Sequence, residues 1–203
     1  GIDSFPVIVY SGDSMRVRPE WASTGQFNHC ILAIKVDDTI DGPALLVHPK
    51  RGRFMIFDPT SPYVAFRALP KVDGGGYGLF ISGSDGELLK LPAIETSRSS
   101  KTIAYRLNPD GSLTGTMERT GFGPVAEQIR AEHRSLSPTD FQKNQQKLLQ
   151  QTMPNAEASR LEATDDFERG SFRLKMDFSA SAYGKSMRDT LLVFKPAVLS
   201  VGF

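Results

Sequence analysis

Short apolar runs separated by turn residues dominate the first half of the chain. Six runs rich in apolar and β-branched residues predict strands, at 5–10, 27–36, 44–48, 53–58, 78–83 and 87–91. The last two are separated by Ser84-Asp85-Gly86, which predicts a hairpin. Pro59 and Pro62 end the 53–58 strand, because proline has no N–H for a strand ladder. Residues 11–26 are rich in glycine and polar residues and predict a loop.

The second half has a different pattern. Alternating apolar residues predict strands around 103–107, 112–118 and 172–178, and a further apolar run predicts a last strand at 190–201. Helical spacing predicts helices at 124–134 and 138–152. Ser137, followed by Pro138 and Asp140, is typical of a helix N-cap and first turn. The expected order is ββ-αα-βββ.

These elements predict an α+β fold with two domains. An antiparallel sheet forms the first, over residues 1–92, and a smaller α+β domain forms the second, over residues 101–203. The polar, turn-rich stretch 92–100 is the expected boundary.

Composition and charge exclude several classes of function. Apolar residues make up 39% of the 203 residues, which is enough for a buried core, and the net charge of +1 gives no field for nucleic acid or an anionic membrane. No apolar stretch reaches the length of a membrane span. Cys30 is the one cysteine, which excludes an internal disulfide and a multi-cysteine zinc site. No motif predicts a metal or a cofactor. Because the chain starts at Gly1 and enters a strand almost at once, we expect an excised fragment.

Two short strings carry the candidate chemistry. His29 lies near the start of one apolar strand, and Asp58 lies at the end of another. If these strands pair antiparallel, the two side chains meet at one edge of the sheet, where a carboxylate can orient a basic imidazole. From spacing alone, a structural histidine and an ordinary Asp-Pro-Thr turn are also open.

The strings FNHCILAIKV and RFMIFDPTSPY resemble the second half of the core of bacterial transglutaminase-like proteins, which have a papain-like fold. NPDGSLTGTMERTG and the closing strands resemble the C-terminal α+β domain of the same proteins. The resemblance implies that His29 and Asp58 belong to a Cys-His-Asp triad that performs acyl transfer or amide hydrolysis on peptide-like substrates. It also implies a periplasmic or cell-envelope location, with no cofactor.

The resemblance places the nucleophilic cysteine upstream of this sequence, so we expect the chain alone to be inactive. Cys30 cannot replace it, because neighbouring strand residues point to opposite faces. We expect Cys30 to be buried and inert. Trp21, in the loop before His29, is a candidate to line the acyl pocket, and a plain packing anchor is the alternative.

The expected partner is a peptide or protein amide substrate, bound through the parent protein. Self-association through an exposed sheet edge is a further expectation. The competing hypothesis is a non-catalytic binding or scaffolding module of the bacterial envelope.

Overall fold

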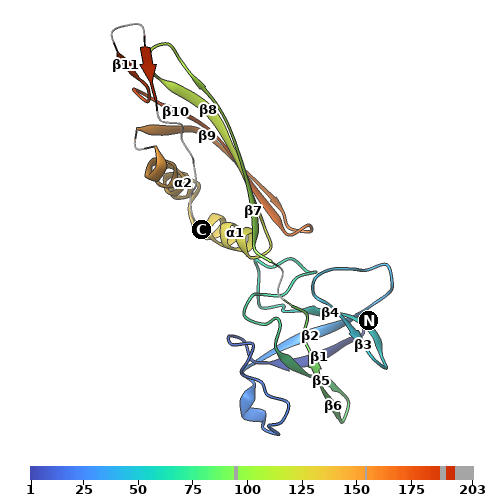
Figure 1. Cartoon of the computed structure of the whole chain (residues 1–203). Helices are drawn as coiled ribbons and strands as arrows, with labels where there is room; N and C mark the ends of the chain where they lie inside the picture. The colour runs from blue at the N-terminus through green and yellow to red at the C-terminus, as the bar shows by residue number, and fades with distance from the viewer. Residues whose placement is uncertain (94–95, 154, 188–190, 195–203) are drawn as a thin grey trace. The chain divides into compact units, whose positions relative to one another are not determined.

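The computed structural model describes residues 1–93, 96–153, 155–187 and 191–194 and shows a mixed α+β fold with antiparallel sheets (Figure 1). The chain divides into two compact units. The first comprises Gly1–Arg98 with the short segments Gly123–Glu127 and Phe167–Gly170, and the second comprises the rest of the chain. No helix of the described residues has both the length and the apolar character that crossing a membrane requires.

A six-stranded antiparallel sheet forms the first unit, in the order β3-β4-β2-β1-β5-β6 (Figure 1). Its strands lie where the apolar runs predicted them: β1 (Ser4–Val9), β2 (His29–Val36), β3 (Leu45–His48), β4 (Gly52–Phe57), β5 (Tyr77–Ser82) and β6 (Asp85–Lys90). The hairpin turn falls at Gly83-Ser84, slightly earlier than predicted, because Ser82 pairs with Asp85. Gly83 has a φ of 63°, which glycine adopts without strain. A short 3-10 helix, Thr24–Gln26, interrupts the predicted loop.

The sheet of the first unit is strongly curled. Phe54 on β4 and Phe80 on β5 have ring centroids 5.2 Å apart, although β2 and β1 separate these strands in the sheet. The two edge strands also meet, since His48 Nε2 on β3 lies 3.1 Å from Glu87 Oε2 on β6. The inner face of the sheet therefore wraps around a core of aromatic and aliphatic side chains.

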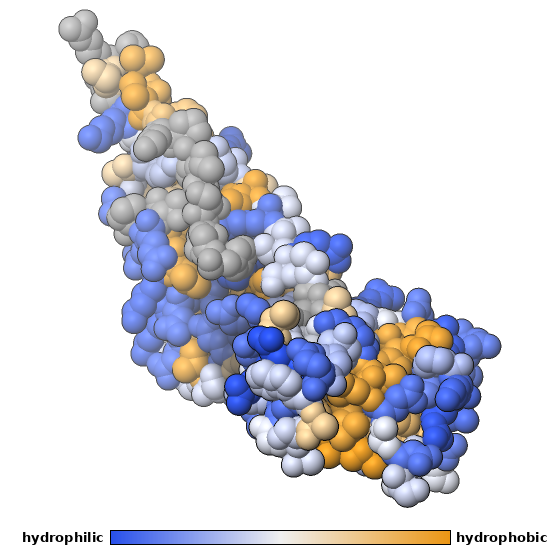
Figure 2. All heavy atoms as spheres, turned by 60° about the horizontal axis from the view of Figure 1, so that its bottom comes forward, coloured by the Kyte–Doolittle hydropathy of each residue, from blue (hydrophilic) through white to orange (hydrophobic). Residues whose placement is uncertain are grey.

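The two faces of this sheet differ in burial. On β2, Ile31 and Ala33 are fully buried, whereas Leu32 and Ile34 on the other face are only half-buried. Figure 2 shows a hydrophobic area on one face of the molecule. Cys30 lies on the outer face of β2 and is exposed, so the prediction of a buried cysteine was wrong. Strand alternation fixes the face of a residue but says nothing of what covers that face.

The second unit contains a four-stranded antiparallel sheet in the order β7-β8-β10-β9 and two helices. The elements are β7 (Arg98–Leu107), β8 (Leu113–Phe122), α1 (Pro124–Ser135), α2 (Pro138–Thr152), β9 (Ala156–Asp166) and β10 (Ser171–Ala180). On β10 the predicted alternation is confirmed, with Phe172, Leu174, Met176 and Phe178 buried. Ser137 caps α2 as predicted, since its Oγ accepts a hydrogen bond from the N–H of Asp140 at 3.1 Å.

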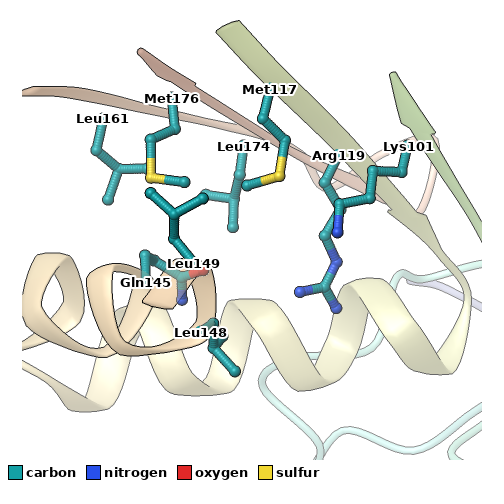
Figure 3. Close-up of a pocket in the computed structure, with 9 residues that line it drawn as sticks. All are labelled: Lys101, Met117, Arg119, Gln145, Leu148, Leu149, Leu161, Leu174 and Met176. Atoms are coloured by element: carbon teal, nitrogen blue, oxygen red, sulfur yellow. The ribbon is translucent and has the colours of Figure 1, made fainter. Parts of the chain in front are cut away.

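An apolar cavity lies between α2 and the inner face of this sheet. Leu149, Leu161, Leu174 and Met176 form its apolar wall, and Arg119 and Lys101 lie at its polar end (Figure 3). Gln145, on α2, is buried against it. The helix therefore covers the sheet through leucine and methionine side chains, as expected for the core of an α+β unit.

Strand β9 was not predicted because most of its side chains are exposed and its apolar pattern is weak. A further two-stranded sheet joins β11 (Lys185–Met187) and β12 (Leu191–Val193). Most of the strand predicted at 190–201 lies outside the described residues.

A charged cluster anchors the second unit. Arg130, on α1, is fully buried, and its Nε donates to Asp165 Oδ1 at 2.8 Å. Arg134 Nη2 donates to the other oxygen of Asp165 at 3.1 Å. Every charge of this cluster faces an opposite charge, which is the arrangement that a buried ion pair requires.

Candidate functional site

His29 is the first residue of β2 and lies on the inner, buried face of the curled sheet. Its strand pairs antiparallel with β1, where Val9 lies opposite His29. The preceding residue fixes the start of the strand. Asn28 Oδ1 accepts a hydrogen bond from the N–H of Ser11 at 2.6 Å, and its Nδ2 donates to the Ser11 carbonyl at 3.1 Å. Asn28 therefore ties the beginning of β2 to the loop that follows β1.

Asp58 directly follows β4, the strand that pairs with β2 on the side opposite to β1. Ala33 lies opposite Ile56 in this antiparallel ladder, so Asp58 lies diagonally across from His29 on the same face. Thr60 fixes the carboxylate, because its N–H and hydroxyl both donate to Asp58 Oδ1, at 2.9 and 2.7 Å. The Asp-Pro-Thr string thus forms a turn that also orients the carboxylate.

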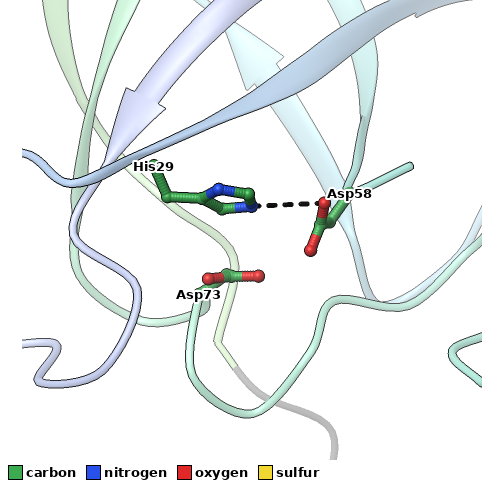
Figure 4. Close-up of side chains that lie close together, drawn as sticks. All are labelled: His29, Asp58 and Asp73. Carbon is green, nitrogen blue, oxygen red and sulfur yellow. Dashed lines mark ion pairs between the residues drawn. The ribbon is translucent and has the colours of Figure 1, made fainter. Parts of the chain in front are cut away.

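The imidazole and the carboxylate form a close pair. His29 Nε2 lies 3.3 Å from Asp58 Oδ1, with His29 one quarter exposed and Asp58 buried. The expected antiparallel pairing of the two strands predicted this contact, and Figure 4 shows it. The other ring nitrogen, Nδ1, points away from Asp58 (Figure 4). Among the described residues, Nδ1 has no hydrogen-bond partner. An imidazole held through Nε2 with Nδ1 free is suited to accept and return a proton.

A third side chain, Asp73, completes the cluster. It lies in the long loop between β4 and β5, is 3% exposed, and has its carboxylate beside the imidazole and facing Asp58 (Figure 4). One imidazole nitrogen of His29 and one carboxylate oxygen each from Asp58 and Asp73 lie within 4.8 Å of one another. Neither oxygen of Asp73 has a hydrogen-bond partner of good geometry among the described residues.

The glycine run that follows Asp73 holds its loop in place. The N–H of Gly75 donates to the Pro92 carbonyl at 2.8 Å, and a side chain at Gly76 would come within 2.9 Å of the Ser14 carbonyl oxygen. A run of glycines is by itself typical of a flexible connector. The structure instead shows a close backbone approach that needs glycine.

The two carboxyl groups have opposite pKa shifts. Burial alone would raise the pKa of Asp58, but hydrogen bonds from Thr60 and His29 outweigh it and hold that pKa below its usual value. Burial raises the pKa of Asp73, and the charge of Asp58 raises it further. Ser11 lies near enough to oppose this rise in the pKa of Asp73, without a well-formed hydrogen bond.

An open concavity lies beside His29. Its lining includes Phe27, Asn28 and Thr60, together with Ile8, Cys30 and Leu79, which share the outer face of the sheet, opposite to the face of His29. Trp21, the candidate for an acyl pocket, is not among the lining residues. It is 52% exposed, which does not fit a buried packing anchor, and the guanidinium of Arg18 lies 5.2 Å from its ring.

No model of a protein family matches the chain, and neither the curated proteins nor the solved structures contain a match to it. The candidate site is therefore defined by the fold and by the geometry of its own residues.

Proposed function

We propose that this chain supplies the base and the orienting carboxylate of a Cys-His-Asp site that performs acyl transfer or amide hydrolysis on peptide-like substrates. The observation that carries the proposal is the His29–Asp58 pair, in which Nε2 lies 3.3 Å from the carboxylate and Nδ1 has no hydrogen-bond partner in the part of the chain that the structure describes. Asp58 is itself fixed by Thr60, so the imidazole is held by a second layer of hydrogen bonds.

The proposed chemistry runs in two steps. The Nδ1 atom of His29 takes the proton of a thiol, and the thiolate attacks the amide carbonyl carbon. The carbon–sulfur bond forms, the carbon–nitrogen bond breaks, and the departing amine takes the proton from Nδ1. Water or a second amine then attacks the thioester while Nδ1 of His29 accepts its proton. The carbon–sulfur bond breaks, and the imidazolium returns that proton to the leaving thiolate. Asp58 stabilises the imidazolium in both steps.

The nucleophile of this proposal is a cysteine of the parent protein that lies outside residues 1–203. Cys30 is the one cysteine within these residues and lies on the opposite face of β2 from His29. The resemblance of the His29 and Asp58 strings to bacterial transglutaminase-like proteins supports this chemistry and an envelope location. The same resemblance supports a peptide or protein amide as substrate.

The first test is activity. The chain alone should release no ammonia or product amine from a glutamine peptide in the presence of a primary amine. In a longer protein that joins this sequence to the cysteine-bearing segment, His29→Ala should abolish turnover, and Asp58→Ala should lower kcat by about 10²–10⁴-fold. His133→Ala is the matched control, because His133 is exposed and lies in the second unit. Unchanged turnover in His29→Ala would remove His29 from the reaction.

A non-catalytic binding module is the second candidate. The residue at the nucleophile position of the longer protein separates the two. Cysteine at that position fits acyl transfer, whereas alanine, serine or glycine there would overturn the cysteine mechanism.

A further inference from the structure

The structure assigns a second capacity to the same cluster: we propose that His29, Asp58 and Asp73 bind a divalent transition metal of the zinc type, and that the bound metal blocks His29 as a base. The metal binding is independent of the proposed function, whereas the blocking rests on it.

The donor atoms of the cluster fit a transition metal of this type. One imidazole nitrogen and two carboxylate oxygens converge within 4.8 Å, and His29 Nε2 and Asp58 Oδ1 are 3.3 Å apart. Zinc bonds of about 2.0–2.2 Å in a tetrahedral site separate neighbouring ligand atoms by about 3.4 Å. Two of the three ligands therefore already have the required spacing, and an oxygen of Asp73 lies within 4.8 Å of both. A mixed imidazole–carboxylate set with no thiolate fits Zn²⁺ better than Ca²⁺ or Mg²⁺.

The burial of Asp73 and its lack of hydrogen bonds also favour a bound cation. This side chain is only 3% exposed, and both its carboxylate oxygens lack a hydrogen-bond partner among the described residues. Figure 4 shows it aimed into the space between the imidazole and Asp58. Leaving a buried carboxylate without a donor or cation is costly, and a second carboxylate next to it increases the cost. A divalent cation between the two carboxylates removes both penalties.

The consequence for His29 follows from proton placement. A metal binds the lone pair of Nε2, so the single proton of the neutral imidazole must lie on Nδ1. Nδ1 then donates and can no longer take a proton from a thiol. In the metal-free protein we expect the opposite arrangement, with the proton on Nε2, which lies 3.3 Å from Asp58 Oδ1, and with Nδ1 unprotonated. The bound metal would thus inhibit acyl transfer by reversing the tautomer of His29.

The test uses isothermal titration calorimetry with ZnCl₂ in a Cys30→Ser background, because the exposed thiol of Cys30 could bind zinc by itself. The expected result is one zinc per chain, with the dissociation constant raised at least tenfold by His29→Gln, Asp58→Asn and Asp73→Asn alike. Asp41→Asn and His133→Gln, at exposed positions, are matched controls that should bind as the background does. Absence of one-to-one binding in the background, or unchanged binding in Asp73→Asn, would overturn the site.

A second readout keeps the proposal testable where a variant folds poorly. In ¹⁵N spectra of the Cys30→Ser protein, ZnCl₂ should move the His29 proton from Nε2 to Nδ1, while His48 and His133 keep their signals. Zinc binding without this change would place the metal elsewhere. The outcomes of the two proposals are distinguishable, because zinc binding is measured on this chain, whereas acyl transfer is measured on the longer protein.

Discussion

The two units of this protein bury charged side chains in two different ways. In the second unit, the buried guanidinium of Arg130 faces Asp165, and Arg134 faces the other oxygen of the same carboxylate. In the first unit, two buried carboxylates, Asp58 and Asp73, flank one imidazole, and neither oxygen of Asp73 has a hydrogen bond of good geometry among the described residues. The first arrangement is compensated and serves stability. The second is uncompensated, which is common where a side chain is kept for chemistry or for a ligand.

The compensated cluster gives the largest expected effect. Asp165→Ala should lower the free energy of unfolding by about 3–5 kcal/mol, because it removes the carboxylate to which the fully buried Arg130 donates. Urea unfolding followed by circular dichroism measures this loss. Arg134→Ala is the matched control, since Arg134 is half-exposed and should cost less than about 1 kcal/mol. A loss below about 1 kcal/mol in Asp165→Ala would show that the cluster does not anchor the unit.

The edge contact of the curled sheet gives a smaller effect. His48 is buried, and its Nδ1 accepts the N–H of Lys50 at 3.1 Å, so Nε2 carries the proton that faces Glu87. The angle at Nε2 is not that of a good hydrogen bond. Glu87→Ala should lower the free energy of unfolding by about 1–2 kcal/mol, because it removes the acceptor that faces the buried Nε2 of His48. Glu87→Gln should cost less, because it keeps an acceptor. Equal unfolding midpoints for Glu87→Ala and the unaltered protein would show that this contact does not stabilise the fold.

The cluster of His29, Asp58 and Asp73 predicts a change of the opposite sign in the free energy of unfolding. Asp73→Asn should stabilise metal-free protein near pH 7, because burial raises the pKa of Asp73 and its ionisation then costs folding free energy. The gain should amount to about 1.4 kcal/mol for each unit of that rise. Below about pH 4, the unfolded chain is protonated as well, so the gain should vanish. Unfolding of Asp73→Asn and the unaltered protein between about pH 3 and 8 tests this. A gain independent of pH would contradict it.

Asp58 should follow the reverse course. Burial alone would raise its pKa, but the hydrogen bonds from Thr60 and His29 hold the pKa below its usual value, so its ionised form stabilises the fold. That contribution is complete above about pH 4 and is lost as the pH falls through the lowered pKa. Asp58→Asn should therefore destabilise the protein at about pH 7, and the difference should shrink in acid. A destabilisation that is equally large in acid and at neutral pH would contradict the role of its charge.

The sequence made the His29–Asp58 pair predictable for a physical reason. His29 begins one apolar strand and Asp58 directly follows another, and antiparallel pairing of these strands then places both side chains on one face. Asp73 was not predictable, since it lies in a loop without periodicity whose course depends on close backbone packing at Gly75 and Gly76. The presence of glycines directly after Asp73 was the only local signal.

Other features depend on the tertiary structure in the same way. Alternation showed that Cys30 faces away from His29, but not that this face is open to solvent. The helix cap at Ser137 followed from local chemistry and was predicted, whereas the contact of Phe54 with Phe80 needs the curl of the whole sheet. Strand β9 was missed because an exposed strand has little apolar pattern to detect.

Measuring the tautomer and the hydrogen bonding of His29 in the metal-free protein tests the proposed catalytic pair most directly. Long-range ¹H–¹⁵N correlation spectra of the ¹⁵N-labelled chain should show the proton on Nε2, protected from exchange by its bond to Asp58, and an unprotonated Nδ1. The protection should disappear in Asp58→Ala and persist in Cys30→Ser. A proton on Nδ1, or an Nε2 proton whose exchange does not change when Asp58 is removed, would contradict the proposal that this carboxylate orients the imidazole for proton transfer.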